Sequence, residues 1–209
     1  MIIIKNNHSR KLKILLYIKR RSLIRQHNLI YIFQIVLPVE ASKNNVLRNP
    51  PKLRILLVNT KIQRNTKVMV QKVASHFNEN PCQVQQAIDE IDQLAKTSIE
   101  LLSANCDILA DDQLIFRKWG KLIDRNQFVL ANGLCVSHSK LDSVCKLASQ
   151  YGLHAKLTGA GGGGYAFVIL PLLVDAKILQ KITAELINMD CGVCETTLGS
   201  TGGVKIIVL

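Results

Sequence analysis

The stretch Lys156-Leu-Thr-Gly-Ala-Gly-Gly-Gly-Gly-Tyr165 is the most distinctive part of this 209-residue sequence, because it holds five glycines within six positions. Glycine loses more backbone freedom on folding than any other residue, so an ordered loop of this kind must gain free energy from close contacts. A backbone without Cβ atoms lets N–H groups approach a phosphate or another segment closely. The stretch therefore predicts a phosphate-binding or tightly packed loop, with a mobile hairpin loop as the alternative.

The residues that flank the glycines show which elements the loop joins. A Walker A loop is excluded, because no Gly-Lys-Ser/Thr follows the glycines. The spacing Gly159-x-Gly161-x-x-Gly164 also fits the dinucleotide fingerprint, but that motif must open a helix. The next residues, 165–170, are aromatic and β-branched and favour a strand, as do residues 153–158 before the loop. We therefore expect the loop to join two strands.

Hydrophobic periodicity predicts the other elements. Apolar residues at three- and four-residue steps indicate helices, which we expect from residue 66 through at least residue 74 and at 81–102, 111–133, 139–151 and 175–189. Short apolar runs indicate strands, which we expect at 53–58, 153–158, 165–170, 193–198 and 204–209. This order predicts an α+β fold in which an antiparallel sheet packs on helices.

Several residues are typical of helix ends. Thr66 is an expected N-cap, and Asn80 is expected to cap the helix that begins with Pro81. Ser139 and Asp142 have the spacing of a capping box, and Gly152 is placed to end that helix in a left-handed conformation.

The net charge of +12 suggests a nucleic-acid-binding protein until its distribution is considered. Residues 1–50 hold ten basic residues and one acidic residue (+9), whereas residues 51–209 hold seventeen and fourteen (+3). The folded part is therefore only mildly basic, and we expect no nucleic-acid partner. No apolar run reaches the length needed to span a bilayer, so no membrane partner is expected either.

The pair of prolines at 50 and 51 sets the expected domain boundary, because proline interrupts regular elements. We expect a basic N-terminal extension at 1–47 and one folded domain at 48–209. The acid-free start of the chain allows a targeting segment, but its composition favours a plain extension. The six scattered cysteines are typical of reduced thiols, and Cys191-Gly-Val-Cys194 has no second pair to complete a metal site. We expect a cytoplasmic protein, with mitochondrial or peroxisomal locations as alternatives.

The glycine stretch, preceded by Ser139-Lys-Leu-Asp142 and Gly152-Leu-His154, closely resembles the third motif of the GHMP small-molecule kinases, and within them of the mevalonate kinases. Leu56-Leu-Val-Asn-Thr-Lys61 followed by Arg64-Asn65-Thr66 resembles their strand and polar turn, with Gln63 in place of the usual proline. Further agreement comes from segments in the expected order, namely Ile123-Asp124, Asn126-Gln127, His138, Glu195–Gly199 and Gly202–Val204. The resemblance covers about residues 48–209.

This resemblance implies the C-terminal half of a two-half α+β kinase, a ferredoxin-like sandwich that binds ATP with Mg²⁺ and transfers phosphate to mevalonate in the isoprenoid and sterol precursor pathway. It implies that Thr158, Gly159, Ala160, Gly161, Gly162, Gly163 and Gly164 line the nucleotide-phosphate side. Arg64, Asn65 and Thr66 would lie on the substrate side, although Thr66 is equally well explained as a cap. Lys156 either stands with Thr158 at the loop entrance or faces solvent on its strand. His138 and His154 are interpreted as structural.

The resemblance also implies that the main phosphate loop, the catalytic aspartate and lysine and the magnesium ligand belong to the family's N-terminal half. No glycine precedes Gly120, so that phosphate loop has no counterpart in these 209 residues, and we expect no catalytic or metal-binding residue here. We therefore expect a kinase chain that has little activity alone. It would pair with a complementary N-terminal half or form a homodimer. A non-catalytic binding or regulatory domain of the same fold is the alternative.

Overall fold

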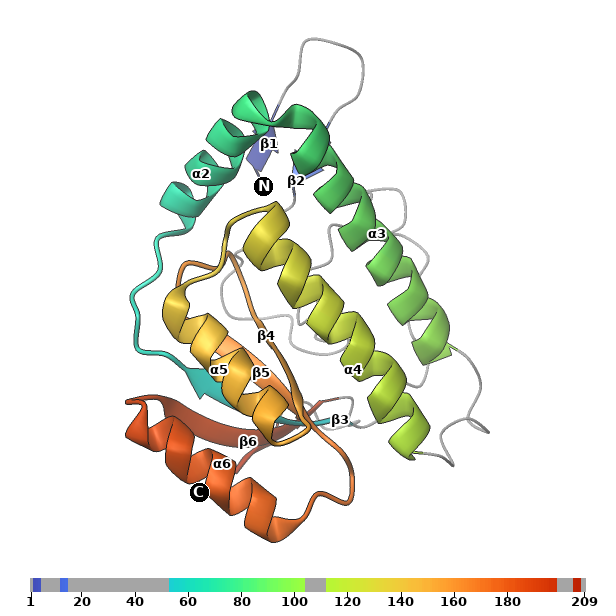
Figure 1. Ribbon diagram of the computed structural model, residues 1–209, viewed down its shortest axis with the longest axis vertical. Helices are drawn as coiled ribbons and strands as arrows, with labels where there is room; N and C mark the ends of the chain where they lie inside the picture. The colour runs from blue at the N-terminus through green and yellow to red at the C-terminus, as the bar shows by residue number, and fades with distance from the viewer. Residues whose placement is uncertain (1, 5–11, 15–52, 104–111, 199–204, 208–209) are drawn as a thin grey trace.

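The computed structural model describes residues 2–4, 12–14, 53–103, 112–198 and 205–207 (Figure 1). Its strands are β1 (Ile2–Ile4), β2 (Leu12–Ile14), β3 (Leu53–Asn59), β4 (His154–Leu157), β5 (Tyr165–Leu170), β6 (Gly192–Leu198) and β7 (Lys205–Ile207). Its helices are α2 (Thr66–Glu79), α3 (Pro81–Ser103), α4 (Asp112–Phe128), the π-helical turn η3 (Val129–Gly133), α5 (Ser139–Gln150) and α6 (Ala176–Asn188). Each expected helix and strand is therefore present, with ends that differ by a few residues.

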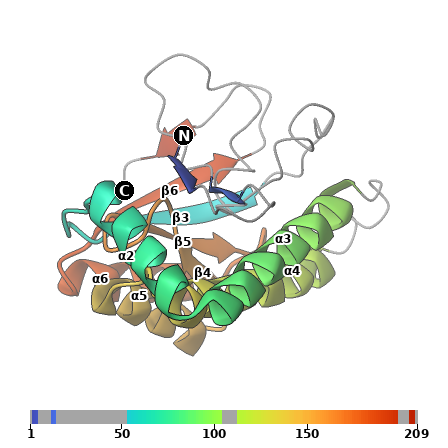
Figure 2. The ribbon, with the colours of Figure 1, turned by 90° about the horizontal axis from the view of Figure 1, so that it is seen from above.

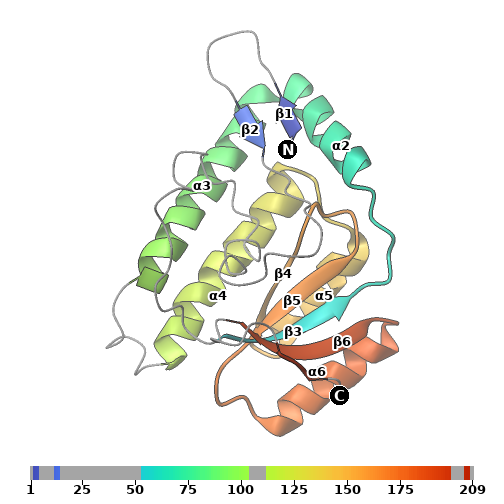
Figure 3. The ribbon, with the colours of Figure 1, turned by 180° about the vertical axis from the view of Figure 1, so that it is seen from behind.

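The main sheet has five strands in the order β4-β5-β3-β6-β7, and all neighbours are antiparallel. Strand β3 lies in the middle, with Leu56 opposite Val168 of β5 and Glu195 of β6. Helices α5 and α6 cover one face of this sheet, which Figures 2 and 3 show from above and from behind. The expected α+β fold, an antiparallel sheet packed on helices, is confirmed.

The core lies mainly between the sheet and these helices. Its buried side chains come from β3, β4 and β5 on one side and from α5 and α6 on the other, and they include Leu56, Val58, Ala155, Leu157, Ala166, Val168, Leu141, Val144, Ile182 and Leu186. A second buried cluster on the opposite side joins Trp119 and Ile123 of α4 to Ile55, Phe167 and Ile169. Buried surface on both sides of β5 fixes the strand that leaves the glycine loop.

Helices α3 and α4 lie side by side along the edge of the molecule (Figures 1 and 3). The apolar face of α3 is buried at Val84, Ile91 and Ala95, and α4 contributes Trp119 and Ile123. The two helices are in contact with each other. Helix α4 ends in η3, where Leu134 N–H donates to the carbonyl of Val129 at 3.0 Å.

Two helix caps differ from the expectation by one residue. Asn65, and not Thr66, caps α2, because its Oδ1 accepts from the amides of Lys67 and Val68 at 3.1 and 3.2 Å. Thr66 is already the first helical residue.

Helix α5 shows the second difference. His138, and not Ser139, caps it by accepting from the amide of Lys140 at 3.1 Å. Asp142 instead accepts a hydrogen bond from the hydroxyl of Ser137 at 2.5 Å, so the expected capping box does not form. Helix α3 begins at Pro81 and Gly152 has a left-handed φ of 68°, both as expected, whereas the Asn80 side chain lies 3.5 Å from Nδ1 of His76 in α2.

Part of the sequence-based prediction lies outside the described residues, including most of the basic extension, the boundary between 47 and 48, Cys106 and the segment 199–204. Within the described residues, no helix is both long and apolar enough to cross a bilayer. The division into an extension and a domain stays a prediction.

Candidate functional site

The glycine loop joins β4 to β5 at one end of the sheet, and the amide of Thr158 donates to the carbonyl of Tyr165 at 2.8 Å to close it. Glycine is required where the loop touches other backbone. A methyl group added at Gly161, where φ is 78°, would lie 2.0 Å from the carbonyl oxygen of Val136. One added at Gly163 would lie 2.7 Å from the side chain of Ile62. Both distances are too short for any other residue, so the loop is built by close approach.

Hydrogen bonds hold the loop between two segments. The amide of Gly162 donates to Val136 at 2.8 Å, on the connection between α4 and α5. The amide of Gly164 donates to Ile62 at 3.0 Å, on the connection between β3 and α2. The carbonyl of Gly164 accepts from both the amide and the hydroxyl of Thr60, each at 2.8 Å. The loop is therefore packed against both connections, as expected for a tightly packed loop and not for a mobile hairpin loop.

Four other loop amides, those of Gly159, Ala160, Gly161 and Gly163, donate to no backbone carbonyl of the described residues. Among these four residues, Gly159 is only partly buried. Successive backbone amides in turns with left-handed residues form concave donors that suit an anion. The loop geometry is compatible with phosphate oxygens as acceptors.

Arg64 supplies a positive charge beside these amides. A methyl group added at Gly159 would lie 2.2 Å from Nη1 of Arg64, and one added at Gly164 would lie 3.0 Å from its Cδ. The side chain therefore extends along the loop. Arg64 is an exposed residue, so its guanidinium can reach a solvent-borne anion.

The three predicted substrate-side residues have different surroundings. Arg64 lies on the loop, whereas the Asn65 side chain is occupied with capping α2. Thr66 is half-buried in the first turn of that helix. The sulfur of Met69, one turn further, would lie 2.6 Å from a methyl group added at Gly162. The structure thus brings the first turn of α2 against the loop.

Lys156 is buried, so the solvent-facing interpretation of this residue is wrong. Its side chain is 0% exposed, and its Nζ lies 5.8 Å from the ring centroid of Phe167. Burial lowers the pKa of this ammonium group from 10.5 to about 7, although the nearby Cys145 acts in the opposite direction. Burial also raises the pKa of the Cys145 thiol to about 12, and the charge of Asp142 adds to that effect. Both faces of β4 are covered at Lys156, and the alternation of polar and apolar residues along the strand does not indicate this.

The sequence marks only some of the polar groups that lie behind the loop. Oε1 of the buried Gln127 accepts from the amide of Leu157 at 2.9 Å, and its Nε2 donates to Ser137 at 3.4 Å. Gln127 was recognised through its motif, but Ser137 and the Val136 carbonyl carried no signal. A backbone acceptor does not depend on side-chain type, so sequence patterns do not mark it.

The two histidines have structural roles. His138 caps α5, and Nδ1 of His154 lies 2.7 Å from Oδ2 of Asp124. The ring of His154 also packs on Gly120, where a methyl group would lie 2.1 Å from it. These contacts join α4 to β4.

Metal-binding chemistry is not built into the described part of the chain. Within it, no group of three or more His, Cys, Asp and Glu side chains is placed to hold a metal ion. The five described cysteines are free thiols, with Cys191 buried and Cys194 half-buried on β6 or next to it. The loop amides and Arg64 suit a phosphate, whereas Mg²⁺ prefers carboxylate ligands that the described residues do not gather.

Comparison with known proteins identifies relatives of this chain. The family model "GHMP kinases C terminal" matches residues 113–188. Mevalonate kinase of Bos taurus is 34% identical over 169 residues, which cover 78% of this chain and 40% of the bovine protein. The chain is a mevalonate kinase homologue that contains a GHMP kinase C-terminal domain. Mevalonate kinase of Homo sapiens is 33% identical over 160 residues, covering 77% of this chain and 40% of the human protein.

The fold comparison gives the same family architecture. The crystal structure of L. major mevalonate kinase in complex with R-mevalonate has a TM-score of 0.58, with 22% identity over 73% of this chain and 44% of that chain. The homologue described here spans about 40% of the length of the curated mevalonate kinases it matches. Its folded part is thus a GHMP kinase C-terminal domain.

Proposed function

We propose that this domain forms one wall of an ATP-dependent phosphotransferase site that transfers a phosphoryl group to mevalonate, giving 5-phosphomevalonate. The supporting observation is the packed glycine loop, in which the guanidinium of Arg64 lies beside Gly159 and the Gly159 amide donates to no backbone carbonyl of the described residues. Such a group of donors suits the phosphates of a nucleotide. The likeness to mevalonate kinases supports mevalonate as the alcohol.

The residues take different parts in this proposal. Thr158 and the loop Gly159–Gly164 would face the nucleotide phosphates and brace the main phosphate loop of the other half. Arg64 would offset the negative charge that develops on the transferred group, while Asn65 and Thr66 hold the start of α2 at the site. Phosphoryl transfer depends mostly on positioning and charge neutralisation, so these are useful contributions.

The remaining groups must come from elsewhere. Mg²⁺ bound with the nucleotide would neutralise part of the phosphate charge. We propose that its ligands, the catalytic aspartate and the lysine belong to an N-terminal half that completes the site, in a longer chain or in a partner chain. A homodimer is the other arrangement considered. We further propose that residues 48–209 form the domain and that it works in the cytoplasm.

The test is a calorimetric titration of the purified 209-residue chain with ATP and Mg²⁺, with and without mevalonate. Magnesium-dependent ATP binding that Arg64→Met weakens at least about tenfold is the expected result, because a charge-assisted hydrogen bond typically contributes more than 1 kcal/mol. Lys72→Met, which removes an exposed lysine from α2, is the matched control and should bind normally. Equal binding by the Arg64 variant would contradict the role of this residue.

The same titration distinguishes the proposed phosphotransferase site from the second candidate function, a non-catalytic binding or regulatory domain. A non-catalytic domain of this fold would bind no nucleotide but could still bind a partner through the surface around the loop. Exposed apolar side chains near it, Val68 on α2 and Tyr165 on β5, favour contact with another protein surface. Absence of ATP binding with and without mevalonate would support this alternative.

A further inference from the structure

The connection between β3 and α2 carries Arg64, and its position on the glycine loop depends on a few contacts. Thr60 and Ile62 hydrogen bond to Gly164 and lie on the inner side, where Thr60 is fully buried. Lys61, between them, is exposed and has a left-handed φ of 57°. A lysine in this conformation is strained, and such strain persists where the surroundings impose it.

The side chain of Lys61 reaches Asp190, in the turn between α6 and β6. Its Nζ lies 2.5 Å from Oδ1 of Asp190. Asp190 is also left-handed, with φ 56°, and its amide donates to the carbonyl of Ile187 at 2.8 Å. The hydrogen bond from Lys61 holds the pKa of the Asp190 carboxyl below its usual value. Two strained turns are thus joined by one ion pair.

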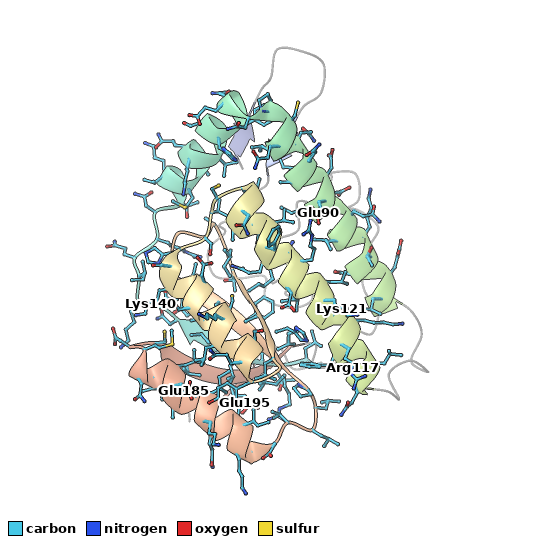
Figure 4. All side chains as sticks on the ribbon, viewed as in Figure 1. Glu90, Arg117, Lys121, Lys140, Glu185 and Glu195 are labelled. Carbon is cyan, nitrogen blue, oxygen red and sulfur yellow. The ribbon has the colours of Figure 1, made fainter. Side chains whose placement is uncertain are left out.

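A third element takes part through Lys140, in the first turn of α5. Its Nζ donates to the carbonyl of Asp190 at 3.1 Å and lies 3.8 Å from Oδ2. A positive charge in the first turn opposes the helix dipole, so Lys140 does not stabilise α5 by its position. Figure 4 shows Lys140 at the edge of the molecule, on the side of α5 away from α4. One carboxylate therefore ties two lysines from separate elements to the turn before β6.

Stability alone does not explain this cluster. Exposed ion pairs contribute little, because solvent screens them and long side chains lose freedom. Glycine at either left-handed position would avoid the backbone strain. The ion pair joins the turn before β6 to Lys61, the residue between the two that hydrogen bond to Gly164.

We propose that Lys61, Asp190 and Lys140 form an ionic latch that positions the Arg64-bearing connection on the glycine loop. Lys61 and Asp190 are then positioning residues for that loop. The link to nucleotide binding rests on the proposed function, whereas the latch itself does not.

Two loop amides provide an internal comparison. The amide of Gly164 donates to Ile62 on the latched connection, whereas the amide of Gly162 donates to Val136 on a different one. Hydrogen exchange of both is measured by NMR on the full 209-residue chain without nucleotide. In Lys61→Met and in Asp190→Asn, Gly164 exchange should rise about three- to fivefold while Gly162 exchange stays unchanged.

Exchanging the charges of positions 61 and 190 is the control, because it distinguishes loss of the ion pair from a general structural effect of each substitution. Lys140→Met alone should give a smaller rise in Gly164 exchange than Lys61→Met. In the Lys140→Met background, which removes the charge that would repel a lysine at position 190, the double variant Lys61→Asp with Asp190→Lys should return Gly164 exchange to within about twofold of Lys140→Met alone. Unchanged Gly164 exchange in both single variants would overturn the latch. An equal rise at Gly162 and Gly164 would also overturn it, because it would indicate general destabilisation.

A titration with ATP and Mg²⁺ separates this proposal from the function proposed above. If wild type binds no nucleotide but the exchange results hold, the latch stands and the nucleotide site fails. If wild type binds nucleotide and exchange is unaffected by the substitutions, the site stands and the latch is wrong.

Discussion

Replacing the buried Lys156 by methionine tests whether burial of its ammonium group makes the free energy of unfolding depend on pH. Methionine keeps an unbranched chain of similar length but removes the ammonium group. Lys156 is 0% exposed and lies near the Phe167 ring, in a region where desolvation opposes the charged form. Its pKa falls from 10.5 to about 7 in the folded protein.

The direction and size of the effect follow from proton linkage. Between pH 7 and 10.5 the unfolded chain binds more protons at Lys156 than the folded chain, so the free energy of unfolding rises with pH. Integrated from pH 7 to pH 10, this gives a gain of roughly 3 to 4 kcal/mol. Below pH 7 the lysine is charged in both states and destabilises the fold most strongly.

The assay is urea unfolding at pH 7, 8, 9 and 10, with free energies from linear extrapolation. Wild type should gain about 3 kcal/mol more than Lys156→Met across this range. Both proteins are compared in a Cys145→Ala background, because the charges of Cys145 and Lys156 shift each other's pKa. The control is Lys146→Met, which removes an exposed lysine from α5 and should follow wild type. A Lys156→Met protein with the same pH dependence as wild type would refute the reasoning.

Three further predictions concern the loop, a cap and activity. Gly161→Ala should destabilise the fold by at least about 3 kcal/mol, because the added methyl group meets the Val136 carbonyl. Gly152→Ala should cost about 1 kcal/mol, because only its left-handed φ is strained. Thermal unfolding compares the two variants, and equal losses of stability would contradict the described packing of the loop. His138→Ala should cost about 1 kcal/mol and Ser139→Ala less than about 0.5 kcal/mol; the reverse order in urea unfolding would restore the serine cap. The 209-residue chain alone should phosphorylate mevalonate far more slowly than ordinary kinases, and a coupled ADP assay giving about 1–100 s⁻¹ would refute this.

The elements of the fold were predictable because their signals are local. Periodic apolar residues in 81–102 predict α3, which runs from Pro81 to Ser103. Aromatic and β-branched residues after the glycines predict β5, which begins at Tyr165 as expected. In both cases the side chains that mark the element also form its buried face.

Two kinds of feature were not predictable from the sequence: a choice between neighbouring residues that suit the same role, and a contact with residues far away in the chain. Asn65 and Thr66 both suit an N-cap, and only the backbone angles of the folded chain select Asn65. Lys156 lies on a strand with both faces covered, which its own neighbours in sequence do not indicate. The partners of the glycine loop include the carbonyls of Val136 and Ile62, which no side-chain pattern marks.

The most direct test of the proposed site is a chimera in which the part of this chain that matches Bos taurus mevalonate kinase replaces the corresponding part of the bovine protein. The chimera would supply the remaining catalytic groups from the bovine part. It should release ADP in the presence of mevalonate at a rate within about 1–100 s⁻¹, and Arg64→Met should lower that rate at least about tenfold. A folded chimera that binds ATP with Mg²⁺ but releases no ADP when mevalonate is added would contradict the proposed function.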